Sequence, residues 1–152
     1  MFKKVSALIL TLFVFSFSFG ASEKLVYINV QKIINESQAG KDAQKILEEA
    51  AKKAQSMLEA KAKTISKTDQ KAQQELQMLA AQKQQEILQK RQEIADKFMK
   101  LVQDAMNKYA KEKGFLMVFD KQTVLYGKPY LDKTEEFLAY FNNMYKKGPK
   151  IK

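Results

Sequence analysis

The chain has 152 residues, enough for one small domain, and a formal net charge of +10 from 27 basic and 17 acidic side chains. It contains no histidine and no cysteine. These absences exclude disulfide staples, thiolate or histidine metal sites, and the usual nucleophilic triads, which need an imidazole base. The sequence therefore predicts no catalytic residue, no cofactor and no metal site.

Residues 1–20 have the pattern of a secretory signal peptide. Two lysines form a charged start, residues 5–19 are an apolar run with few interruptions, and small residues follow. The run is shorter than the roughly 20 residues that a membrane-spanning helix needs, which favours a cleaved signal over an uncleaved anchor. The cleavage position is expected after Gly20 or after Ala21.

The mature chain is expected to open with a strand and a short helix. Residues 25–30, LVYINV, alternate bulky apolar and β-branched side chains, which is typical of a strand. Residues 31–35 can form a short helix. A break over residues 36–40 follows, in which Ser37 is a plausible cap for the next helix.

Residues 39–113 dominate the sequence. They contain one glycine, Gly40, and no proline, and they consist mainly of strong helix formers. Apolar residues recur at three- and four-residue steps along one narrow seam, so a helix here must lie against one partner helix and otherwise face water. Ser66 and Asp69 resemble a capping box, which predicts a hairpin tip at residues 64–69 and helices over about 40–63 and 67–113. A single unbroken helix is the alternative.

The last 39 residues are expected to return to a β structure and end in a helix. Gly114 is a good C-terminal cap. Residues 115–119, FLMVF, predict a buried strand, and residues 123–126, TVLY, predict a second strand that closes a hairpin with a three-residue loop. A final helix capped by Asp132 or Thr134 is expected to run to about residue 145.

The expected fold class is therefore α+β, with a small β body and a long protruding antiparallel helical hairpin. The hairpin, residues 39–113, is an insertion that forms a coiled-coil arm. The body combines residues 21–38 with residues 114–152, which include the C-terminal helix.

Two blocks of the sequence resemble the ends of the Skp (OmpH) family of periplasmic chaperones. They are residues 24–47, KLVYINVQKIINESQAGKDAQKIL, and residues 113–138, KGFLMVFDKQTVLYGKPYLDKTEEFL. The resemblance implies a homotrimer in which strands of three chains form a β-barrel and three helical arms surround a cavity. It implies an ATP-independent holdase that keeps unfolded outer-membrane β-barrel proteins from aggregating. By position, it assigns six residues to the trimer body: Val26, Ile28, Val30, Leu116, Val118 and Val124.

The residues of the arm fit such a role, although the arm looks shorter than in typical members of the family. Flexible apolar side chains suit promiscuous binding, and the candidate client contacts are Met57, Met78, Ile87, Phe98, Met99 and Met106. The alternative is that these residues only hold the hairpin together. Residues 39–113 hold 16 basic and 11 acidic side chains, and the predicted tip carries Lys61, Lys63, Lys67 and Lys71. Such a tip can attract acidic clients, or make weak contact with anionic lipid or lipopolysaccharide.

Two other functions compete with the chaperone interpretation. A structural periplasmic coiled coil could link envelope layers, but a simple spacer has no need of a β body. A basic nucleic-acid-binding protein fits the net charge, but the signal peptide and the acidic residues among the lysines argue against specific nucleic-acid binding. An enzyme is not expected, since no Gly-rich phosphate loop or convergent pair of carboxylates is present.

Overall fold

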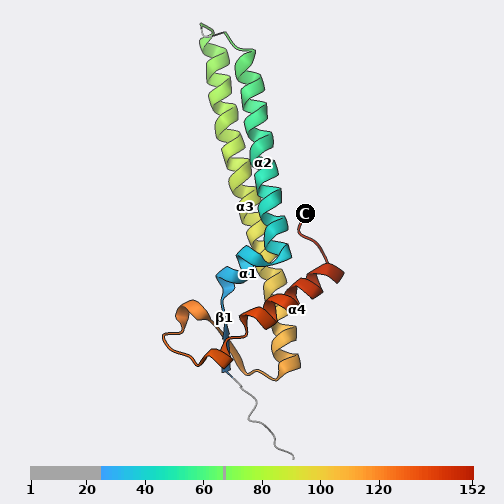
Figure 1. Ribbon diagram of the computed structural model, residues 1–152. Helices are drawn as coiled ribbons and strands as arrows, with labels where there is room; N and C mark the ends of the chain where they lie inside the picture. The colour runs from blue at the N-terminus through green and yellow to red at the C-terminus, as the bar shows by residue number, and fades with distance from the viewer. Residues whose placement is uncertain (1–24, 67) are drawn as a thin grey trace, which may run out of the picture.

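The computed structural model describes residues 25–66 and 68–152, and the predicted signal peptide lies outside them. Two long helices project from a body formed by the other elements (Figure 1). Neither long helix has the apolar surface of a membrane span, and no other helix among the described residues has it. The elements in chain order are β1 (Leu25–Ile28), α1 (Val30–Glu36), α2 (Gln38–Lys63), α3 (Gln70–Lys113), β2 (Met117–Asp120), the 3₁₀ turns η1 (Lys121–Thr123) and η2 (Pro129–Leu131), and α4 (Thr134–Lys147).

The helical hairpin is confirmed. Helix α2 has 26 residues and α3 has 44, which correspond to lengths of about 39 and 66 Å. Helix α3 begins three residues later than expected because Asp69 is itself the cap, its carboxylate accepting a hydrogen bond from the Ala72 amide at 3.0 Å. The Ser66 hydroxyl instead pairs with that of Thr68 at 2.9 Å.

The root of the arm is a sharp break between α1 and α2. Ser37 caps α2 as expected, since its hydroxyl accepts a hydrogen bond from the Gly40 amide at 3.0 Å. Gly40 lies so close to α1 that a Cβ atom built on it would stand 1.8 Å from the Ile34 carbonyl oxygen. The absence of a side chain at Gly40 is therefore what lets the two helices meet at this angle.

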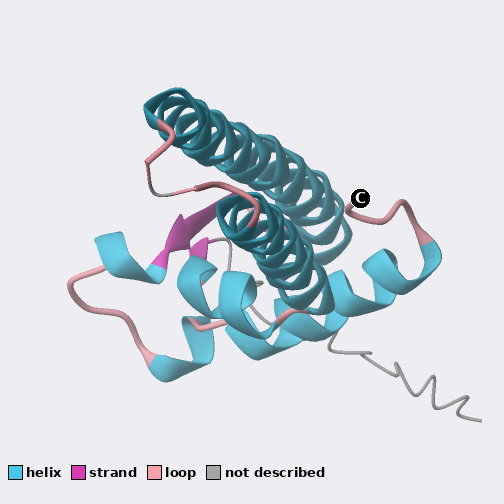
Figure 2. Ribbon diagram, turned by 90° about the horizontal axis from the view of Figure 1, so that it is seen from above, coloured by secondary structure: helices cyan, strands magenta, loops and turns pink. Residues whose placement is uncertain are grey.

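The two strands of the body lie on either side of the arm in sequence and pair in parallel. Val26 stands opposite Val118 in the register. The fold is thus mostly helical with a small two-stranded parallel sheet, which lies beside the paired long helices (Figure 2). The predicted meeting of the opening and closing segments is confirmed.

The predicted hairpin over residues 115–126 is wrong. After β2 the Asp120 carboxylate accepts a hydrogen bond from the Gln122 amide at 3.2 Å, and its carbonyl accepts one from the Thr123 hydroxyl at 2.8 Å. These local bonds turn the chain into η1 instead of a hairpin loop. The chain then wraps around Tyr27, whose hydroxyl donates to the Lys128 carbonyl at 3.3 Å.

The observed elements change the placement of the expected trimer-body residues. Those on strands are Val26, Ile28 and Val118. Val30 begins α1, because the Asn29 side chain caps that helix by accepting from the Lys32 amide at 3.0 Å. Leu116 precedes β2 with 68% of its surface exposed, and Val124 lies in the loop. Their assignment to strands was therefore wrong, while a role in a trimer stays a prediction.

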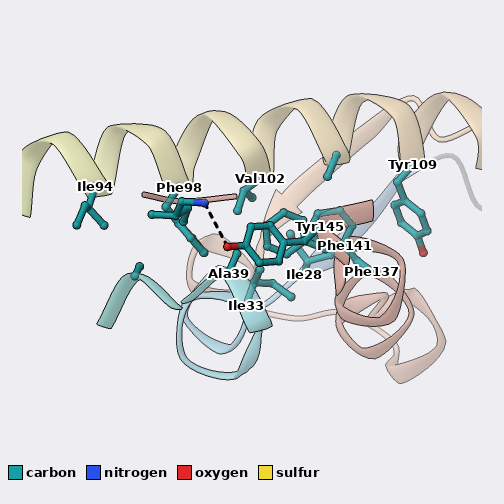
Figure 3. Close-up of a cluster of buried hydrophobic side chains, with 13 residues drawn as sticks. Ile28, Ile33, Ala39, Ile94, Phe98, Val102, Tyr109, Phe137, Phe141 and Tyr145 are labelled. Carbon is teal, nitrogen blue, oxygen red and sulfur yellow. Dashed lines mark hydrogen bonds between the residues drawn. The ribbon is translucent and has the colours of Figure 1, made fainter. Parts of the chain in front are cut away.

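The hydrophobic core lies at the root of the arm, where α3 crosses α4 and the start of α2 (Figure 3). Its largest side chains are aromatic. The Phe98 ring meets that of Phe141 edge to face at a centroid distance of 6.0 Å, and the Tyr109 and Phe137 rings lie 5.4 Å apart. Helix α4 supplies one aromatic face of this core and thereby fixes the arm to the body.

Candidate functional site

The outer part of the arm has a seam but no buried core. Ala54 on α2 and Ile94 on α3 are the last buried residues toward the tip, and none of residues 55–66 and 68–93 is buried. The small apolar residues of the seam are enough to hold two helices together but leave most side chains in solvent. The arm is therefore mainly surface, and any function it has is a surface function.

Apolar side chains stand exposed along this polar surface. Met57, Met78 and Met99 are each more than two-fifths exposed, so they are available for contact, and their role as client contacts stays a prediction. Leu88 is exposed to a similar degree and was missed by the sequence analysis. Its neighbour Ile87 belongs to the seam, and a step of one residue turns the side chain about 100° away from it. That step is the signal that could have identified Leu88.

One groove of about 380 Å³ runs between α2 and α3; we call it the distal groove. Its apolar lining includes Ala54, Met57 and Ile87, two of which were predicted contacts. Its rim carries Lys53, Lys83 and Lys90 against the single carboxylate of Glu86.

The rim of the distal groove keeps a net positive charge. The Lys83 ammonium lies 2.7 Å from the Glu86 carboxylate. This hydrogen bond holds the pKa of Glu86 below its usual value, so the carboxylate stays ionised at neutral pH. Lys90 in turn pairs with Glu93 at 3.4 Å, which leaves Lys53 as the rim lysine without a carboxylate partner among the described residues. The groove therefore favours an apolar ligand with an acidic group.

A second groove of about 540 Å³, the root groove, lies where the sheet meets α3. The body contributes Ile28, Val30, Val118 and Phe119, and α3 contributes Met99, Val102 and Met106. Leu88, Met99 and Met106 are spaced by 11 and 7 residues, which places them within about 20° of one another around α3. We call these three residues the apolar track; Leu88 stands about 16 Å beyond Met99 toward the tip, and Met99 and Met106 line the root groove.

Phe98 does not belong to this surface. Only 5% of it is exposed, and it is part of the core against Phe141. Phe98 lies in the part of the seam that reaches into the body, where a side chain of α3 packs against α4 as well as α2. This position explains why Phe98 is buried and not exposed. The assignment of Phe98 to an exposed client contact is corrected accordingly.

The tip of the arm is basic. Lys61 and Lys63 lie in the last turn of α2, and Lys71 lies in the first turn of α3. All three are exposed, and none of them makes an ion pair within the part of the chain that the structure describes. The fourth predicted tip residue, Lys67, lies outside the described residues.

The described residues thus form a small body that holds out a long two-helix arm with open apolar grooves and a basic tip. The chain belongs to the OmpH-like family, because the profile of that family, described as "Outer membrane protein (OmpH-like)", matches residues 24–141. The resemblance seen in the sequence is thereby confirmed. The OmpH-like family is non-enzymatic, which agrees with the expectation that the protein is not an enzyme.

A solved structure supports the fold. A protein of Caulobacter crescentus CB15, described as a candidate outer membrane chaperone (OmpH-like), aligns with a TM-score of 0.57 and 14% sequence identity. The alignment covers 82% of this chain and 86% of the Caulobacter chain. No curated protein sequence matches the chain.

Proposed function

We propose that the protein is an ATP-independent periplasmic holdase that binds unfolded outer-membrane β-barrel proteins and prevents their aggregation on the way to the outer membrane. In this proposal residues 1–20 are a cleaved signal peptide that directs export. Three chains assemble through their bodies, and three arms surround the client. Contact of the basic tips with anionic lipid or lipopolysaccharide is a weaker, secondary interaction.

The observation that carries the proposal is the apolar track of Leu88, Met99 and Met106, of which the two methionines line the root groove. An unfolded barrel protein exposes strands with alternating apolar side chains and has no fixed shape. A surface that binds it needs many adaptable apolar contacts and no deep pocket, and flexible methionines on an open groove provide such contacts. Membership of the OmpH-like family supports the same conclusion.

Trimerisation would turn weak contacts into useful affinity. If one arm binds a client with a millimolar Kd, about −4 kcal/mol, linking three arms raises the apparent affinity by orders of magnitude without any new contact. The exposed Leu116 and the short sheet also favour assembly, since a two-stranded sheet is only marginally stable by itself.

The test is suppression of aggregation. An outer-membrane barrel protein is diluted from urea into buffer with the mature protein and no nucleotide, and light scattering is followed. We expect scattering to fall to the baseline at about one trimer per client. A mature protein that leaves the scattering unchanged, or that sediments as a monomer at micromolar concentration, would contradict the proposal.

The site within the arm is tested by a matched pair of variants. Leu88→Gln combined with Met99→Gln removes apolar contacts of the track and should weaken client binding about tenfold or more, which corresponds to 1.4 kcal/mol. The control, Gln85→Ala with Gln89→Ala, changes two exposed polar residues of the same helix and should bind as the wild type does. Equal affinity of the two variants would remove the track from the site.

The basic tip is tested by rate. Replacing Lys61, Lys63, Lys67 and Lys71 with Gln should slow client capture at low salt and have little effect at high salt, because salt screens exposed charges. Stopped-flow fluorescence at two ionic strengths measures this difference. An unchanged rate at low salt would show that the tip charge is incidental.

A further inference from the structure

The last residues of the chain, 148–152, fold back from the end of α4 onto the arm. Figure 1 shows this segment turning from α4 toward α2 and α3. Ile151 is only 5% exposed and belongs to the hydrophobic core. The match to the family profile covers residues 24–141, so this segment lies outside the matched residues.

The hydroxyl of Tyr145 joins the segment to the arm. It donates a hydrogen bond to the Asp42 carboxylate on α2 at 2.8 Å and accepts one from the Ile151 amide at 3.2 Å. The dashed line in Figure 3 marks the second bond. Burial raises the pKa of the Tyr145 hydroxyl above its ordinary value, so the group stays protonated and able to donate.

Two lysines hold the last residues of the segment in place. The Lys150 ammonium lies 4.2 Å from the centroid of the Tyr145 ring and donates to the Tyr145 carbonyl. From α3, the Lys97 ammonium donates to the Lys152 carbonyl at 3.2 Å and is held by Glu93 at 2.6 Å. The segment therefore contacts α4, which belongs to the body, and α3 of the arm, and it is linked to α2 through the Tyr145 hydroxyl.

We propose that residues 148–152 form a strap that fixes the angle between the arm and the body. The arm has long leverage: α2 extends about 39 Å, so a 10° change at the root moves the tip by about 7 Å. The strap lies at the root, where it acts on that angle directly. It stiffens the arm root while leaving the seam of the outer arm untouched. This device does not depend on which ligand the arm binds.

The test measures the distance between arm and body by double electron–electron resonance. The chain has no cysteine, so Gln74→Cys on the arm and Asn143→Cys on α4 take spin labels cleanly. Labelled protein is mixed with an excess of unlabelled protein so that each distance comes from one chain. A second pair, Gln74→Cys and Gln89→Cys, lies within α3 and serves as the internal control.

Two variants release the strap in different ways. Ile151→Asp expels the buried side chain, and Tyr145→Phe keeps the ring but removes the bridging hydroxyl. We expect Ile151→Asp to broaden the arm-to-body distribution about twofold or more and Tyr145→Phe to broaden it less, because a segment opens more readily when it buries less apolar surface. The pair within α3 and the helical circular dichroism should stay unchanged. Lys152→Gln keeps the backbone carbonyl and should behave as the wild type does.

Two results would overturn the proposal. One is a native width of the arm-to-body distribution in both variants. The other is loss of the helical signal in either variant, since the segment would then hold the fold and not the arm angle. Client binding is not measured in this experiment, so its outcome is independent of the holdase test.

Discussion

The reassignment of Phe98 from the arm surface to the core can be tested against its neighbour Met99. The two residues are adjacent on α3 and both apolar, but Phe98 is 5% exposed and Met99 is 47% exposed. Phe98→Ala removes a buried ring that meets Phe141 edge to face at 6.0 Å, and truncation of a buried phenylalanine typically costs about 3–5 kcal/mol. Met99→Ala removes a half-exposed side chain and should cost about 1 kcal/mol or less.

The two variants should therefore separate stability from binding. Urea unfolding followed by circular dichroism gives the free energy of unfolding, measured at one chain concentration because assembly contributes to it. We expect Phe98→Ala to lose stability and Met99→Ala to keep its stability but bind unfolded clients more weakly. The reasoning would be refuted if Phe98→Ala unfolded within about 1 kcal/mol of the wild type and lost client binding.

Two further predictions concern the joints of the body. Gly40→Ala places a Cβ against the α1 backbone and should lower the free energy of unfolding by about 2–3 kcal/mol or more. Gly114→Ala, where the added Cβ meets open space at a φ of 72°, should lower it by about 1 kcal/mol. Equal losses of the two variants in urea unfolding would contradict the close approach at Gly40. Burial acts to raise the pKa of the Asp132 carboxyl, but hydrogen bonds from Thr134 and Lys121 outweigh it and the pKa lies below its usual value. The stability that this carboxylate contributes is therefore fully present above the ordinary pKa of Asp, and it is lost as the pH falls through the lowered pKa of the folded state. Asp132→Asn should flatten the dependence of stability on pH in this acidic range, measured by thermal unfolding. An unchanged pH dependence in that range would refute the assignment.

The arm was predictable because its signals are local. Helix-forming composition, the seam period and the cap at Ser37 act over a few residues, and they place both helices and the tip to within two or three residues. The cap of α3 is Asp69 and not Ser66, which the capping-box pattern favoured. The pairing of β1 with β2 followed from the same logic, since a hairpin must bring its two flanking segments together. The family resemblance of those segments agrees with the observed fold.

The predictions that were wrong have two causes. Single side chains compete with the local sequence pattern, and some residues contact elements that are far away in the sequence. Residues 123–126 have a strand pattern, but Asp120 offers the backbone a turn and Tyr27 draws the following loop across the sheet. Asn29 begins a helix where the apolar pattern continued a strand. The burial of Phe98 and of Ile151 depends on the position of α4, which the local pattern of neither residue shows.

The parallel pairing of β1 with β2 has a consequence for how the length of the arm can change. Both strands join the arm at its base, so the contacts within the body do not depend on how far the hairpin extends beyond the last core residues. Insertion of one heptad in each helix would add about 10 Å while keeping the seam nearly in phase. The length of the arm can therefore change without a change in the packing of the body.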